Sequence, residues 1–155
     1  MMRTWWIDES SLLAGSNPSN QHLARLREER FGLAVSLLDE KRTLPRYDQQ
    51  SAASVGWSIY RIPIQEDSVP SLVQVGEFAA LMGAVPPATK TLVFCDGGRR
   101  HSAFMGAVYW IAKGLKVSEA VARVASSAGM DGSWRTDVGD NVLRKFEQLG
   151  WRINP

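Results

Sequence analysis

The stretch that decides the fold runs Thr91-Leu-Val-Phe-Cys-Asp-Gly-Gly-Arg-Arg-His101 and continues as Ser102-Ala-Phe-Met-Gly-Ala-Val-Tyr-Trp-Ile-Ala-Lys113. Its short apolar start is typical of a buried strand, and the apolar stretch over 102–113 indicates a helix that ends before a glycine. Open α/β sheets bind ligands beyond the carboxyl ends of their strands, where a glycine-rich turn leads into a helix. The segment therefore predicts an α/β protein with a ligand site at the start of this helix.

The rest of the chain predicts strands and helices in alternation, followed by helices alone. This order favours a small central sheet, mostly parallel, flanked by helices. Gly32 is expected to end the first helix, and Ser118 is expected to cap the fifth. The expected strands cover 4–8, 11–14, 33–38, 58–63 and 91–94, and the expected helices cover 20–30, 47–53, 71–82, 102–113, 118–127 and 138–149.

Length and composition exclude several classes of protein. The chain has 155 residues, of which 45% are hydrophobic and 22% charged, so we expect one globular domain over 1–155. A net charge of only +2 gives no general attraction to nucleic acid. No apolar run approaches the ~18 residues that a membrane helix needs, and the start of the chain lacks a signal segment. We therefore expect no nucleic-acid partner, no membrane partner and a cytoplasmic location.

Cys95 is the one cysteine of the chain, which excludes an internal disulfide. A thiol at a strand end that precedes a helix start lies among unpaired N–H groups, which favour the reactive thiolate. Gly97 and Gly98 allow successive N–H groups to converge on an oxyanion. A cysteine nucleophile beside such a nest indicates phosphoryl transfer through a thiophosphate. The alternative is a buried thiol without chemistry.

A resemblance to a known family rests on these residues. The run V-F-C-D-G-G-R-R-H-S-A-F-M-G-A-V-Y-W-I-A-K-G is similar to the phosphate-binding loop and following helix of the cysteine-based dual-specificity and tyrosine phosphatases. L-L-A-G-S-N-P, L-A-V-S-L-L-D-E and Y-R-I-P-I-Q-E-D-S-V-P-S resemble further parts of the compact members, so the similarity spans about 4–150. It implies hydrolysis of phosphate monoesters, with a phosphorylated protein or a small phosphate ester as substrate, phosphate or sulfate in the loop, and no cofactor.

The resemblance also implies a role for each matched position. Ser102 would assist departure of the cysteine sulfur, although it could instead cap the helix. The general acid would be Glu66, three residues after Pro63, or its neighbour Asp67. The implied catalytic residues are Cys95, Glu66, Asp67 and Ser102, and the implied phosphate-binding residues are Asp96, Gly97, Gly98, Arg99, Arg100 and His101.

Two positions depart from the family pattern of His-Cys, five residues, Arg and a hydroxyl residue. His101 stands where the arginine is expected, and Phe94 precedes the cysteine. Arginine offers a charged fork of donors, whereas histidine offers fewer donors and is only partly charged near neutral pH. We therefore expect a weak phosphatase that favours acid pH. Arg99 and Arg100 either form a solvated rim or turn one side chain inward in compensation.

Two other functions compete with this interpretation. A phosphatase-like protein without turnover would bind phosphorylated partners, which the changes at 94 and 101 favour. A rhodanese-like sulfurtransferase would use the pattern Cys-x-x-Gly-x-Arg, with Arg100 closing the loop. Sulfur transfer from thiosulfate to cyanide would identify it.

Two tryptophans and the possibility of a metal site remain to be considered. Trp57 and Trp134 are expected to pack in the core or to line a cleft. Two histidines and one cysteine far apart predict no metal site.

Overall fold

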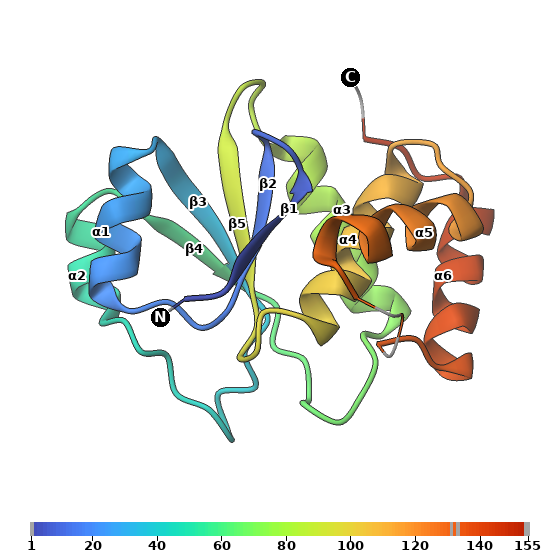
Figure 1. Ribbon diagram of the computed structural model, residues 1–155, viewed down its shortest axis with the longest axis horizontal. Helices are drawn as coiled ribbons and strands as arrows, with labels where there is room; N and C mark the ends of the chain where they lie inside the picture. The colour runs from blue at the N-terminus through green and yellow to red at the C-terminus, as the bar shows by residue number, and fades with distance from the viewer. Residues whose placement is uncertain (1, 131, 133, 154–155) are drawn as a thin grey trace.

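Five strands form one sheet in the order β1-β2-β5-β3-β4 (Figure 1). The computed structural model describes residues 2–130, 132 and 134–153. β1 runs antiparallel to β2, and the pairs β2–β5, β5–β3 and β3–β4 are parallel. The predicted α/β class with a mostly parallel sheet is therefore confirmed. The strands are β1 Thr4–Asp8, β2 Leu12–Gly15, β3 Phe31–Ser36, β4 Ser58–Arg61 and β5 Lys90–Phe94.

Helices cover both faces of the sheet. Figure 1 shows helices on either side of the sheet. α4 is buried at every position after Arg100, as expected of a helix that is apolar all round. The helices on one side are α1 Asn20–Glu28 and α2 Gln49–Ser54, and those on the other are α3 Leu72–Ala84, α4 Arg100–Ala112, α5 Val117–Ala128 and α6 Asp137–Leu149.

Two predicted helix boundaries were wrong. α1 ends at Glu28 and not at Gly32, because Arg30 already adopts the left-handed conformation with φ of 75°. The following strand begins earlier than expected as a result, and Gly32 lies inside it. The N-cap of α5 is Lys116 rather than Ser118, and the Glu119 carboxylate accepts a hydrogen bond from the Lys116 backbone N–H.

The parallel strands bring three loops to one edge of the sheet. β3, β4 and β5 run in the same direction, so the loops that follow them meet at the same end. Figure 1 shows these loops together along the lower edge. They cover 37–48, 62–71 and 95–99, and the last of them contains the cysteine.

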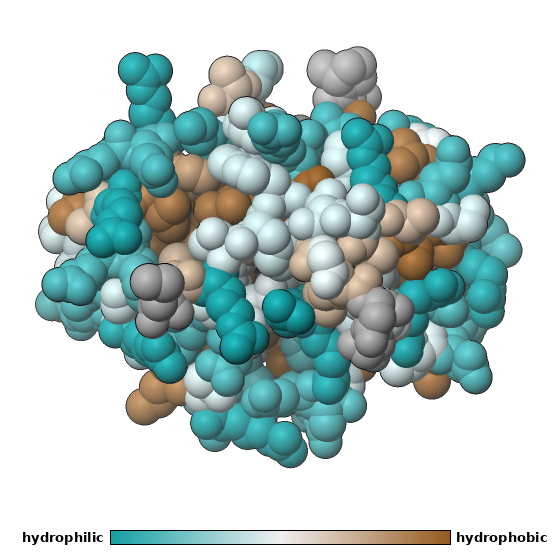
Figure 2. Space-filling view, in the orientation of Figure 1, coloured by the Kyte–Doolittle hydropathy of each residue, from teal (hydrophilic) through white to brown (hydrophobic). Residues whose placement is uncertain are grey.

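The exposed surface in view is mostly hydrophilic. Figure 2 shows brown residues on this face as separate patches among hydrophilic ones. Within the described part of the chain, no helix combines the length and the apolar character that crossing a lipid bilayer requires.

Candidate active site

Cys95 lies directly after β5, at the end of the sheet where the three loops meet. It is 5% exposed, and its backbone N–H donates to the Gly15 carbonyl at 3.2 Å. The Ser102 hydroxyl, which is fully buried, donates to Cys95 Sγ at 3.2 Å. Ser102 is not the N-cap of α4, because the cap position is Arg99 and no side chain caps it. The serine hydroxyl therefore serves the sulfur and not the helix end.

Glycine is required at only one of the two predicted loop positions. Gly98 has φ of 73°, and a Cβ there would lie 2.6 Å from the Ser16 backbone nitrogen. Any other residue would be strained and would push the loop away from β2. Gly97 has no positive φ, and a Cβ there would meet no atom within 4 Å.

The loop and the start of α4 present a series of unpaired donors. No backbone N–H from Asp96 to Ser102 donates to another residue of the described chain. The first bonded amide of the helix is that of Ala103, which donates to the Arg99 carbonyl at 2.7 Å. Free N–H groups at a helix start, together with the positive end of the helix dipole, attract an anion. This backbone is therefore suited to hold a tetrahedral oxyanion above the Cys95 sulfur.

A cavity of about 220 Å³ opens over this loop. Most of the predicted site residues line it, but Gly98, Ser102 and Asp67 do not. The cavity also has lining residues that sequence reasoning missed. The predicted residues that line it are Glu66, Cys95, Asp96, Gly97, Arg99, Arg100 and His101, and the additional ones are Arg3, Leu37, Leu38, Asp39 and Thr43.

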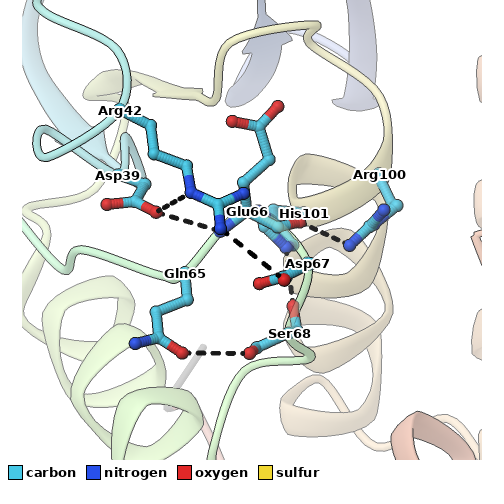
Figure 3. A network of polar contacts seen from close by, with 8 residues as sticks. All are labelled: Asp39, Arg42, Gln65, Glu66, Asp67, Ser68, Arg100 and His101. Atoms are coloured by element: carbon cyan, nitrogen blue, oxygen red, sulfur yellow. Dashed lines mark hydrogen bonds and ion pairs between the residues drawn. The ribbon is translucent and has the colours of Figure 1, made fainter.

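The two candidate acids occupy different positions. Glu66 lines the cavity, and its backbone N–H donates to Asp39 Oδ2 at 3.2 Å. The Asp67 side chain is 72% exposed and lies 3.7 Å from Arg42 Nη2. Figure 3 shows the Glu66 and Asp67 carboxylates pointing in opposite directions from the loop. Of the two candidates, only Glu66 lines the cavity with Cys95.

Two neighbouring side chains tie the loop over 62–71 to α4. Arg100 donates through Nη2 to the Glu66 carbonyl, and His101 Nε2 lies 2.8 Å from the Ser68 carbonyl oxygen (Figure 3). A carbonyl only accepts, so Nε2 of His101 must carry the proton. Arg100 is thus turned to the loop that bears Glu66. Both arginines are exposed and line the cavity, so they lie at its rim.

The surroundings of His101 favour its uncharged form. Burial lowers the pKa of His101 below its ordinary value, and the Arg100 charge lowers it further. The hydrogen bond to Ser68 and the carboxylates of Glu66 and Asp39 act in the opposite direction without reversing the shift. The imidazole therefore carries little positive charge at neutral pH, and its Nε2–H is already engaged by Ser68.

The other residues singled out from the sequence have structural positions. Phe94 is fully buried on the α1 side of the sheet, where its ring meets that of Tyr47 edge-on. Trp57 and Trp134 are 5% and 4% exposed and belong to the two hydrophobic cores, so neither lines the cavity. Among the described residues, no cluster of three metal-ligating side chains occurs.

One missed residue had a signal in the sequence and another had none. Asp39 follows an apolar run that was expected to be a strand, and parallel strands of one sheet end at the same edge. Arg3 lies before β1, far from Cys95 in sequence, and only the pairing of β1 with β2 brings it to the cavity.

Comparison with solved structures identifies the fold. Tk-PTP in its active form superposes with a TM-score of 0.79 and 23% identity over 94% of this chain and 96% of that one. PTPMT1 in complex with PI(5)P superposes with a TM-score of 0.78 and 19% identity, over 96% of this chain and 95% of that one. Kinase associated phosphatase with its catalytic-site cysteine replaced by serine superposes with a TM-score of 0.75 and 14% identity, over 96% of this chain and 94% of that one.

These neighbours are dual-specificity and tyrosine phosphatases, so the chain has the fold of that family, as its sequence predicted. Neither protein-family models nor curated proteins give a match.

Proposed function

We propose that this protein is a cysteine-dependent phosphatase that hydrolyses phosphate monoesters through a thiophosphate on Cys95. The observation that carries the proposal is the buried Cys95 sulfur, hydrogen-bonded to Ser102 and followed by a run of unpaired backbone N–H groups. The groups that nucleophilic catalysis at phosphorus needs are a nucleophile, an oxyanion nest and a stabiliser of the departing sulfur. All three come from one loop and the first turn of α4.

The first step transfers the phosphoryl group to sulfur. The Cys95 thiolate attacks phosphorus, an S–P bond forms and the ester P–O bond breaks. Glu66, in its acid form, gives its proton to the departing ester oxygen, which leaves as an alcohol. The N–H groups of the loop stabilise the charge on the three remaining phosphoryl oxygens.

The second step returns the enzyme to its starting state. Water attacks phosphorus, the Glu66 carboxylate takes a proton from that water, and the S–P bond breaks to release inorganic phosphate. The sulfur leaves as a thiolate, which the Ser102 hydroxyl stabilises by the hydrogen bond seen at 3.2 Å. Glu66 thereby regains the proton that it gave in the first step.

His101 is the weak part of this machinery. The ring donates to the Ser68 carbonyl, and its lowered pKa favours the neutral form, which leaves only Nδ1 for other partners. A phosphate dianion nearby favours protonation of the ring and so creates a second N–H donor. Binding and turnover should therefore be low at neutral pH and should improve in acid.

The substrate is a phosphorylated protein or a small phosphate ester. The arginines at positions 3, 99 and 100 that line the cavity attract an anionic group, although three carboxylates (Asp39, Glu66 and Asp96) line it too. PTPMT1 has been solved with PI(5)P, so phosphoinositides belong in the panel of phosphate esters to test.

Trapping the thiophosphate tests the proposal. The protein is mixed with an aryl phosphate, quenched in acid within one turnover and digested, and the peptide with Cys95 is analysed by mass spectrometry. A phosphoryl adduct on that peptide, increased in Ser102→Ala and missing in Cys95→Ser, supports the mechanism. No adduct in either wild type or Ser102→Ala contradicts it.

A binding protein without turnover is the second candidate. It is favoured by the engagement of His101 with Ser68, which leaves the usual position of the clamping arginine without a charge. In that case a phosphopeptide would bind to wild type and to Cys95→Ser with equal affinity, and neither protein would release phosphate.

A further inference from the structure

The indole of Trp5 reaches the phosphate loop from the first strand. Trp5 lies in β1, and its Nε1–H donates to the Gly98 carbonyl oxygen at 2.8 Å. An indole nitrogen can only donate, so this contact fixes the direction in which the Gly98 carbonyl points. The residues of the reaction described above do not include Trp5.

The direction of that carbonyl decides the direction of an N–H group. The peptide between Gly98 and Arg99 is planar and trans, since the described chain has no cis peptide bond. Its C=O and N–H therefore point in opposite directions. With the Gly98 oxygen bound by Trp5, the Arg99 N–H points away from Trp5, and it has no hydrogen-bond partner among the described residues.

A second peptide of the loop is held in the same way. The Asn17 backbone N–H donates to the Asp96 carbonyl at 3.2 Å, which directs the Gly97 N–H to the opposite side of its peptide. Two carbonyls of the loop, those of Asp96 and Gly98, are thus bound by residues that lie outside the loop. Asn17 follows β2 in the chain, whereas Trp5 uses a side chain that one substitution can remove.

Glycine makes the external contact necessary. Gly98 has φ of 73° and lacks a side chain, so rotation of the Gly98–Arg99 peptide meets little steric resistance. A reversed peptide would present a carbonyl oxygen to the anion in place of an N–H, which is repulsive. The hydrogen bond from Trp5 opposes this reversal.

We propose that Trp5 is a positioning residue that holds the Gly98–Arg99 peptide in the anion-binding orientation. The proposal rests on the loop being the phosphate site of the proposed function. It requires only anion binding, so it holds for the phosphatase and for the binding protein alike.

The strand that carries Trp5 is itself fixed to the back of the loop. Trp5 is paired with Ala14 across β1 and β2, and the Ser16 backbone N–H donates to the Arg3 carbonyl at 2.9 Å. The Arg3 N–H donates in return to the Ser16 hydroxyl at 2.9 Å. Ser16 is also the residue against which Gly98 packs. The donor and the peptide that it orients therefore belong to one rigid unit.

Sulfate affinity of Trp5→Phe tests the proposal against a matched control. Trp57→Phe removes an equivalent bond, from Trp57 Nε1 to the Leu23 carbonyl at 3.0 Å, in the core on the α1 side. Sulfate is measured by titration calorimetry at one pH, and the thermal midpoint of each variant is recorded. We expect Trp5→Phe to bind sulfate about ten-fold more weakly and Trp57→Phe to bind as wild type. Equal affinity in wild type and Trp5→Phe overturns the proposal.

The N–H resonance of Arg99 provides a measurement that general destabilisation of the protein would not change. In wild type, saturating sulfate should shift the Arg99 N–H resonance strongly, and in Trp5→Phe this shift should be lost while the resonances of α6 stay in place. Retention of the full Arg99 shift in Trp5→Phe contradicts the proposal. Wild-type protein that binds sulfate but shows no Cys95-dependent turnover contradicts the phosphatase function and leaves this inference standing.

Wild-type protein alone provides a further test if Trp5→Phe fails to fold. Linkage requires that an anion which depends on the Trp5 bond strengthens that bond by the same factor. Hydrogen exchange of the Trp5 indole should therefore slow by about ten-fold with saturating sulfate, whereas exchange of the Trp57 indole should not change. An unchanged Trp5 exchange rate refutes the proposal.

Discussion

Replacement of His101 by arginine should increase the activity of this protein, although most substitutions in an active site reduce it. His101 occupies the position at which the resemblance to cysteine phosphatases predicts a clamping arginine. Its Nε2 is engaged by the Ser68 carbonyl, and burial keeps its pKa below the ordinary value, so the ring is neutral at pH 7. Arginine at this position would be charged at every working pH and could give two N–H donors to the phosphoryl group.

The size of the gain follows from the contacts. A preorganised donor to transition-state charge contributes about 2.7–4 kcal/mol. Breaking the hydrogen bond from His101 to Ser68 costs about 0.5–1.5 kcal/mol. The difference is about 1.2–3.5 kcal/mol, and since each 1.36 kcal/mol changes a rate by a factor of ten, His101→Arg should raise kcat/KM by about ten-fold or more.

The assay is steady-state hydrolysis of an aryl phosphate at neutral pH, with thermal unfolding to show that the variant is folded. His101→Gln is the matched control, because glutamine keeps an N–H for the Ser68 carbonyl and adds no charge. It should show no gain. A folded His101→Arg protein with a rate equal to or below wild type would refute the reasoning, since position 101 would then not face the phosphoryl group.

Three further predictions concern the other parts of the site. Glu66→Gln should lower kcat by about 100-fold or more for an alkyl phosphate, whose leaving oxygen needs a proton, while Asp67→Asn should stay within about two-fold of wild type; the reverse order would assign the acid to Asp67. Ser102→Ala should slow breakdown of the thiophosphate by about ten-fold, seen as a larger product burst in stopped flow, and a steady-state rate without a burst would contradict this. Gly98→Ala should lower the free energy of unfolding by about 1–3 kcal/mol in urea titration because of its positive φ, and Gly97→Ala should have little effect; equal effects would show that the loop conformation is different.

The segment formed by β5, the glycine loop and α4 could be predicted from the sequence because its local signals agree with one another. A short apolar strand, a glycine turn and a long apolar helix each have a pattern that tertiary packing did not override. β5 and α4 therefore begin and end within two residues of the predicted bounds. The first residue of β3, by contrast, depended on where α1 ended, and a left-handed Arg30 gives no signal in the sequence because glycine or asparagine is usual there.

The candidate site was predictable in its contiguous part and not in its long-range part. Cys95, the loop and Ser102 lie in one segment, so spacing alone placed them together. The contact of Trp5 with Gly98 joins residues 93 apart in the chain and depends on an edge strand whose pairing the pattern did not specify. The contacts of Arg100 and His101 with the loop over 62–71 depend on rotamers, which a sequence does not reveal.

The measurement that tests the account most directly is hydrolysis of an aryl phosphate from pH 5 to 8, with wild type beside Cys95→Ser. Because the pKa of His101 lies below its ordinary value, the ring gains charge only as the pH falls below neutrality, and a bound phosphate dianion shifts that gain to higher pH. The account predicts turnover that requires Cys95 and that rises as the pH falls from 8 into the acid range. Identical rates for the two proteins at every pH would contradict it.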